Sequence, residues 1–184
     1  MLRHGELLIS QTPNILLYLG PKLGLAGGED ENAIYKINQL ALTALDGLSN
    51  EVHDTHHPVA NGAYYEEQKA EAKRKSADFV KNRLPKFLGY FERVLSGEAS
   101  RGGEWLYMGE MTYADLVLWQ CLDGTGFAFP KAVGRLREGG LYKRVFEHQE
   151  RVKGVETVKE YLESERRIAY GNGIYRHYPE LDLE

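Results

Sequence analysis

The sequence is poor in cysteine, in long apolar runs and in charge of one sign. The single cysteine, Cys121, excludes a disulfide framework, and its place in the apolar run LVLWQCL predicts a buried thiol. No segment approaches the roughly 20 apolar residues of a membrane helix. A net charge of −4 leaves no broad positive surface for nucleic acid. We therefore expect neither a membrane nor a nucleic-acid partner.

Several motifs and targeting signals are also missing. The sequence contains no Ser-x-Gly elbow, P-loop or Rossmann glycine pattern, and the pair Gly171 and Gly173 is not followed by a helical pattern. The first residues, MLRHGELLIS, have neither the apolar segment of a signal peptide nor the Arg- and Ser-rich character of a transit peptide. These absences favour a cytoplasmic location.

The rest of the sequence has a helical pattern, and its 184 residues are enough for one domain with a hydrophobic core. Leu7–Ile9 predicts a short strand. A helix then begins near Pro13, with Thr12 or Ser10 as its cap and Gly24 or Gly27 as its stop. Apolar residues three and four apart predict a long second helix from Glu29–Asp30 that ends before Pro58. A third runs from about Glu66, with a kink at Pro85.

The stretch MTYADLVLWQCLDG carries the clearest structural signal. Thr112 and Asp115 have the spacing of a capping box, and the following residues are apolar nearly all round, which predicts a central buried helix. Two more helices are expected in LYKRVFEHQERV and VETVKEYLESERR. The tail, IAYGNGIYRHYPELDLE, is not helical, and its tyrosines either pack it against the bundle or line a pocket.

Three histidines, His53, His56 and His57, crowd the expected end of the second helix beside Asp54. Their spacing can place two imidazoles on one metal ion, but a third ligand has to come from elsewhere. The alternatives are surface or cleft histidines at a helix end and a role facing a substrate. We expect no metal.

The polar elbow Ser10-Gln11-Thr12 separates the expected strand from its helix. The first turn of a helix offers free N–H groups and a positive dipole, so it can hold a carboxylate, and hydroxyl and amide side chains add further donors. The simpler reading is an ordinary helix cap.

The order of these features resembles the cytosolic glutathione transferases. The resemblance rests on the Gln-Thr elbow with ILLYLGPKLGLAG, two long helices, and the Thr112-Tyr113-Ala114-Asp115 cap, and it covers nearly the whole chain. NEVHDTHHP and YLESERRIAYGNGIYRHYPELD look like fungal members related to the alpha, pi and sigma classes. The resemblance implies an all-α bundle of the C-terminal type, residues 28–184, preceded by a strand and helix of a thioredoxin-like domain, residues 1–27.

The resemblance also implies roles for particular residues. Gln11 and Thr12 would hold the γ-glutamyl end of glutathione, the co-substrate. Asp46, with Asn50 as a competitor for the role, resembles the acidic residue that reaches the glutathione of a neighbouring subunit, which implies a homodimer. The side that meets small hydrophobic electrophiles would carry His53, His56 and Tyr178.

One departure from the family pattern changes the expected activity. The thiol-activating Tyr, Ser or Cys and the cis-proline of the thioredoxin-like half have no counterpart, and Met1 to Ile9 contain no Ser, Cys or Tyr. We therefore expect a truncated relative that is weak or inactive in conjugating glutathione, because nothing in that segment stabilises the thiolate. The alternative is a non-catalytic interaction or scaffold module of the same fold.

Overall fold

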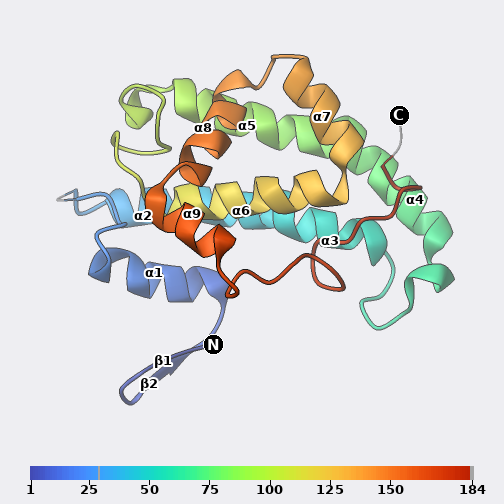
Figure 1. The fold of residues 1–184 in the computed structure, drawn as a ribbon, viewed down its shortest axis with the longest axis horizontal. Coiled ribbons are helices and arrows are strands. Elements are labelled where there is room, and N and C mark those ends of the chain that lie inside the picture. Colours follow the sequence, from blue (N-terminus) through green and yellow to red (C-terminus); the bar gives the residue numbers. More distant parts are fainter. Residues whose placement is uncertain (29, 183–184) are drawn as a thin grey trace.

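The structure, a computed structural model, describes residues 1–28 and 30–182 and consists of a helical bundle from which a β-hairpin projects (Figure 1). Strands β1 (Leu2–His4) and β2 (Leu7–Ile9) pair antiparallel. Gly5, at φ 59°, supplies the left-handed turn between them. The all-α architecture with a small N-terminal strand element is therefore confirmed.

Helix α1 (Thr12–Lys22) follows β2 directly and ends before Gly24, whose φ of 70° is the left-handed conformation typical of a helix stop. The predicted stop is thus confirmed, but the predicted cap is wrong. Gln11 occupies the N-cap position, and no side chain caps the helix. The physical reason is the backbone of Gln11, whose φ of 69° and ψ of 118° differ from the extended conformation of an ordinary cap.

Two long helical paths form most of the bundle. The first consists of α2 (Ala33–Ala44), the π-helical segment η1 (Leu45–Asn50) and α3 (Glu51–His56). The second consists of η2 (Tyr65–Glu67), α4 (Lys69–Asp78), the π-helical segment η3 (Phe79–Arg83) and α5 (Leu84–Ser96). Of the expected start at Glu29–Asp30, Glu29 lies outside the described residues, and Asp30 precedes the helix, which begins only at Ala33 after the N-cap residue Asn32.

A glycine and a proline account for features of the two π-helical segments. Gly47 in η1 lies against the ring of Phe87 on α5, where any Cβ would overlap the ring carbons. Pro85 lies in the first turn of α5 and has no N–H to continue the hydrogen-bond ladder of η3. The break expected at Pro85 therefore takes the form of a widened turn just before it.

Helix α6 (Tyr113–Ala128) lies at the centre and is buried along most of its length (Figure 1). The predicted capping box is confirmed, with the N–H and hydroxyl of Thr112 both donating to Oδ2 of Asp115 at 2.7 and 2.8 Å. The other carboxylate oxygen accepts from the Leu106 N–H and from Nε2 of buried His148, each at 2.8 Å. Asp115 therefore joins α6, the preceding loop and a neighbouring helix in one buried network.

The remaining described elements are η4 (Glu98–Ser100), α7 (Pro130–Glu138), α8 (Lys143–Lys153), α9 (Glu156–Glu163) and a non-helical tail. Helix α7 is absent from the predicted elements. Its first turn is capped from the tail, where the Asp182 carboxylate accepts from the N–H groups of Lys131 and Ala132 at 2.7 and 3.0 Å. Cys121 is buried, as expected, and burial raises the pKa of its thiol to about 12.

Candidate functional site

The Ser10-Gln11-Thr12 elbow is exposed at the junction of β2 and α1. Its backbone carbonyls support the first turn. The Gln11 carbonyl accepts from the backbone N–H of Ile15 at 2.9 Å, and the Ser10 carbonyl accepts from the side-chain amide of Asn14 at 3.3 Å. No side chain caps the helix and Pro13 has no N–H, so the backbone N–H groups of Thr12 and Asn14 are the donors of the first turn without an acceptor in the helix. The elbow therefore presents donors and a positive helix end to an anion.

The backbone of Gln11 is strained. A φ of 69° places this non-glycine residue in the left-handed region, which residues with a Cβ rarely adopt. Strain of this kind is typical of ligand-binding positions, where the surrounding structure holds an unfavourable conformation in place. Sequence patterns carry no signal for it.

A contact between the hairpin and α1 lies close to the elbow in the chain. Nδ1 of His4 and the hydroxyl of Tyr18 are 2.7 Å apart, and the ammonium of Lys22 lies 4.8 Å from the centre of the Tyr18 ring. The sequence carries no signal for this pair, since His4 and Tyr18 stand 14 positions apart without a shared motif. The contact holds the projecting hairpin against α1.

Asp46 and its competitor Asn50 lie together rather than apart. The π-helical segment η1 carries both, and the Asn50 amide donates to the Asp46 carboxylate at 3.2 Å. Both side chains are exposed. A π-helical turn inside a longer helix is frequent at functional sites, because it re-aims side chains on one face.

The three histidines at the end of α3 form a cluster, with ring centres 4.8 to 5.1 Å apart. His56 is fully buried, and its Nε2 donates to the carbonyl oxygen of Ile174 in the tail at 2.9 Å. Burial lowers the pKa of His56 to about 4. His53 is partly exposed. No group of His, Cys, Asp or Glu side chains suited to a metal ion is found among residues 1–28 and 30–182.

The tail brings Tyr178 to this cluster. Tyr178 stacks on Tyr65 with ring centres 3.8 Å apart and lies 6.1 Å from the His56 ring. Glu180 fixes the same segment, since its carboxylate accepts from Lys69 at 2.8 Å and from the Tyr65 hydroxyl at 3.2 Å. The hydrogen bond from Lys69 is the main cause that lowers the pKa of Glu180 to about 2. Three of the predicted site residues, His53, His56 and Tyr178, therefore lie in one region.

A capped central helix, two long helical paths packed around it and a polar elbow at the N-terminal end define the class as an all-helical domain with an appended strand element. Residues 53–165 match the family described as "Glutathione S-transferase, C-terminal domain". Because this match covers more than half of the sequence, the chain belongs to that family. None of the helices in the described part of the chain is long and apolar enough to cross a membrane.

Two curated relatives and one solved structure extend the comparison. The glutathione S-transferase of Plasmodium falciparum (isolate 3D7) is 24% identical over 173 residues, which span 92% of this chain and 72% of the relative. That of Plasmodium yoelii yoelii is 25% identical over 171 residues, with coverage of 92% and 69%. "Structure of NaGST-2" aligns with a TM-score of 0.57 at 19% identity, covering 87% of this chain and 70% of that one, and shows that the fold is shared.

Proposed function

We propose that this chain binds glutathione at the Ser10-Gln11-Thr12 elbow and takes part in conjugating its thiol to small hydrophobic electrophiles. The observation that carries the proposal is the strained backbone of Gln11 at the uncapped start of α1. The backbone N–H groups of Thr12 and Asn14 and the exposed side chains of Gln11 and Thr12 supply donors for the carboxylate at the γ-glutamyl end.

Asp46 takes the role of a second contact to glutathione in this proposal. An exposed carboxylate complements the α-amino group of glutathione, and the hydrogen bond from Asn50 orients it. The glutathione that Asp46 reaches belongs to a second copy of the chain, so this contact requires a homodimer.

The electrophile side of the proposed site is the histidine and tail region. His53 is partly exposed beside the cluster, whereas buried His56 contributes by holding the tail that carries Tyr178. The partly exposed ring of Tyr178, stacked on buried Tyr65, supplies an aromatic surface suited to a hydrophobic electrophile.

The proposed activity of this chain by itself is weak or absent. Conjugation requires a donor that stabilises the glutathione thiolate, and Met1 to Ile9 contain no Ser, Cys or Tyr. Membership of a fungal group related to the alpha, pi and sigma classes, a cytoplasmic location and a role in detoxification belong to the same proposal.

Calorimetric titration of the purified chain with glutathione tests the elbow. Thr12→Ala removes a hydroxyl donor to a charged group, so the dissociation constant is expected to rise about tenfold or more. Thr157→Ala, an exposed threonine in the first turn of α9, is the matched control and leaves it unchanged. Equal affinity of the Thr12 variant and the parent chain would remove the elbow from the binding role. Rapid conjugation of chlorodinitrobenzene by the parent chain would contradict weak activity.

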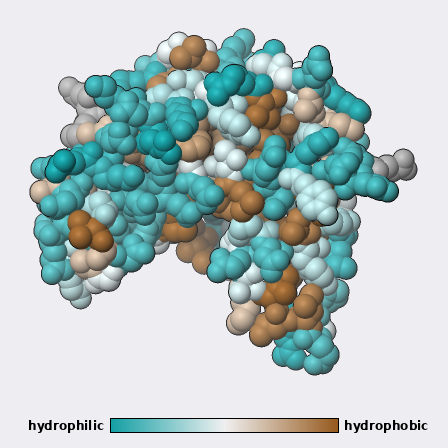
Figure 2. Space-filling view, turned by 180° about the vertical axis from the view of Figure 1, so that it is seen from behind, coloured by the Kyte–Doolittle hydropathy of each residue, from teal (hydrophilic) through white to brown (hydrophobic). Residues whose placement is uncertain are grey.

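A non-catalytic interaction module is the second candidate, and the hairpin favours it. Leu7 and Leu8 are 41% and 59% exposed, and Figure 2 shows apolar side chains on the lobe formed by the hairpin and α1. Contiguous exposed apolar surface is typical of sites that contact another protein. A chain that does not bind glutathione in the titration above supports this second function over the first.

A further inference from the structure

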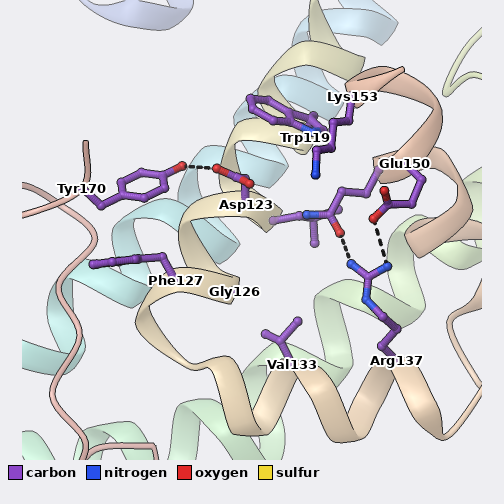
Figure 3. A pocket seen from close by; sticks show the side chains of 11 residues that line it. Trp119, Asp123, Gly126, Phe127, Val133, Arg137, Glu150, Lys153 and Tyr170 are labelled. Atoms are coloured by element: carbon purple, nitrogen blue, oxygen red, sulfur yellow. Dashed lines mark hydrogen bonds and ion pairs between the residues drawn. The ribbon is translucent and has the colours of Figure 1, made fainter. Parts of the chain in front are cut away.

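A pocket of about 420 Å³ opens between α6, α7, α8 and the start of the tail (Figure 3). None of the predicted site residues lines it. Its volume lies in the range of small-molecule sites. Two aromatic rings form one wall, since Phe127 and Tyr170 have ring centres 5.0 Å apart and planes tilted by only 32°. The indole of Trp119 lines the pocket as a further flat surface. Such walls suit a flat ring.

Trp119 supplies an unmatched hydrogen-bond donor. The side chain is 5% exposed, and its Nε1–H has no acceptor among the residues that the structure describes. The Tyr170 hydroxyl differs, since it donates to the Asp123 carboxylate at 2.7 Å and accepts from the Gln120 amide at 2.9 Å. A buried donor without an acceptor is uncommon in folded proteins, and a ligand oxygen placed beside it would supply the missing acceptor.

Two carboxylates and two cations line the pocket, and both carboxylates already have an ion-pair partner. The Asp123 carboxylate is paired with Arg167 at 2.9 Å. The Glu150 carboxylate is paired with Arg137 at 3.2 Å (Figure 3). Lys153 also lines the pocket, and it forms no ion pair within the described part of the chain. The complement of an unpaired ammonium and an unmatched N–H is an anion with acceptor oxygens.

From these three observations we propose that the pocket binds an aromatic carboxylate of one or two rings. The ring system lies against Phe127, Tyr170 and Trp119, and the carboxylate binds the Lys153 ammonium and the Trp119 N–H. The indole nitrogen is covered in the present conformation, so a side chain in the wall must turn when the ligand enters. Lys153 is exposed and long enough to make that turn.

Titration with 2-naphthoate, followed through the indole N–H signals in a ¹H–¹⁵N spectrum, tests the proposal. The chain has two tryptophans, and Trp105→Phe leaves the Trp119 signal alone. That signal is expected to move saturably as the carboxylate becomes its acceptor. The neutral analogue 2-naphthalenemethanol, which keeps the rings and loses the charge, is expected to bind at least about tenfold more weakly.

Two pairs of variants locate the site. Lys153→Met keeps the aliphatic stem and removes the charge, so 2-naphthoate is expected to bind at least about tenfold more weakly. Lys159→Met is the control, because Lys159 lies on α9 and pairs with Glu156. Gly126→Leu fills the pocket from α6, where a Cβ meets only Val133 at 4.0 Å, and is expected to abolish binding. Gly134→Leu, at a position with no atom near its Cβ, is expected to leave binding unchanged.

Three outcomes would overturn the proposal. They are a Trp119 signal that moves linearly without saturation, equal binding of the carboxylate and the neutral alcohol, and saturable binding that neither Lys153→Met nor Gly126→Leu weakens. None of these readouts involves glutathione, so the proposal for the pocket is tested independently of the proposal for the elbow.

Discussion

Replacing Gln11 by glycine separates the stability of the elbow from its proposed role in binding. A non-glycine residue in a sparsely populated backbone region costs about 1 to 3 kcal/mol. Glycine adopts φ near 69° without that strain but loses roughly 0.5 to 1 kcal/mol more through chain entropy. The Gln11 side chain is exposed and caps nothing, so little else is lost. We expect Gln11→Gly to raise the free energy of unfolding by about 1 kcal/mol.

Urea unfolding followed by far-ultraviolet circular dichroism measures this change, and a glutathione titration of the same variant measures binding. Gln39→Gly, at an exposed position within α2, is the matched control and is expected to lower the free energy of unfolding by about 1 kcal/mol. Glutathione affinity is expected to fall in the Gln11 variant, because an amide donor is lost. A loss of stability in Gln11→Gly as large as that in Gln39→Gly would contradict backbone strain at Gln11.

Three further predictions concern the bundle. Asp115→Ala removes a buried acceptor and is expected to lower the free energy of unfolding in urea by about 3 to 5 kcal/mol. Asp54→Ala, at an exposed position, is expected to lower it by less than about 0.5 kcal/mol, and equal losses would contradict the network described for α6. Burial lowers the pKa of His56 to about 4 from 6.5, so between these pH values the unfolded chain binds more protons than the folded chain. The free energy of unfolding is therefore highest above pH 6.5 and falls by about 3 kcal/mol toward pH 4, and His56→Gln is expected to remove this pH dependence if burial of His56 is its cause. Gly47→Ala is expected to lower the free energy of unfolding by about 1 to 3 kcal/mol, because the added Cβ overlaps the Phe87 ring. Adding Phe87→Leu is expected to restore most of that loss, and a double variant as unstable as Gly47→Ala would show that the overlap is not the cause.

Features that depend on local sequence were predictable from it. The Thr112–Asp115 spacing predicts the capping box, and the apolar run around Cys121 predicts a buried helix, because both follow from residues a few positions apart. The predicted cap of α1 is wrong because a cap also depends on backbone angles, which these residue types do not determine. Ser10 and Thr12 have the right chemistry for a cap, but the backbone angles of Gln11 decide which residue occupies that position.

Features made by distant partners gave no usable signal. Helix α7 is polar and short, and the carboxylate that caps its first turn comes from Asp182 in the tail. The pocket beside it likewise depends on Tyr170 meeting Phe127 across more than 40 positions. For the proposed glutathione site, the sequence indicated the residue types at the elbow, whereas the strain at Gln11 appears only in the backbone angles.

The cap that Asp182 provides for α7 has a consequence for how the chain folds. Its hydrogen bond to Ala132 closes a loop of 50 positions, so the first turn of α7 is completed only after the tail has crossed the bundle and docked (Figure 1). Contacts of such long sequence separation form late, because the entropy of closing the loop is lost before the contact is gained. Helix α6, whose cap lies three positions away, has no such delay. We therefore expect assembly to run from the centre outward, with α7 among the last helices to become fixed.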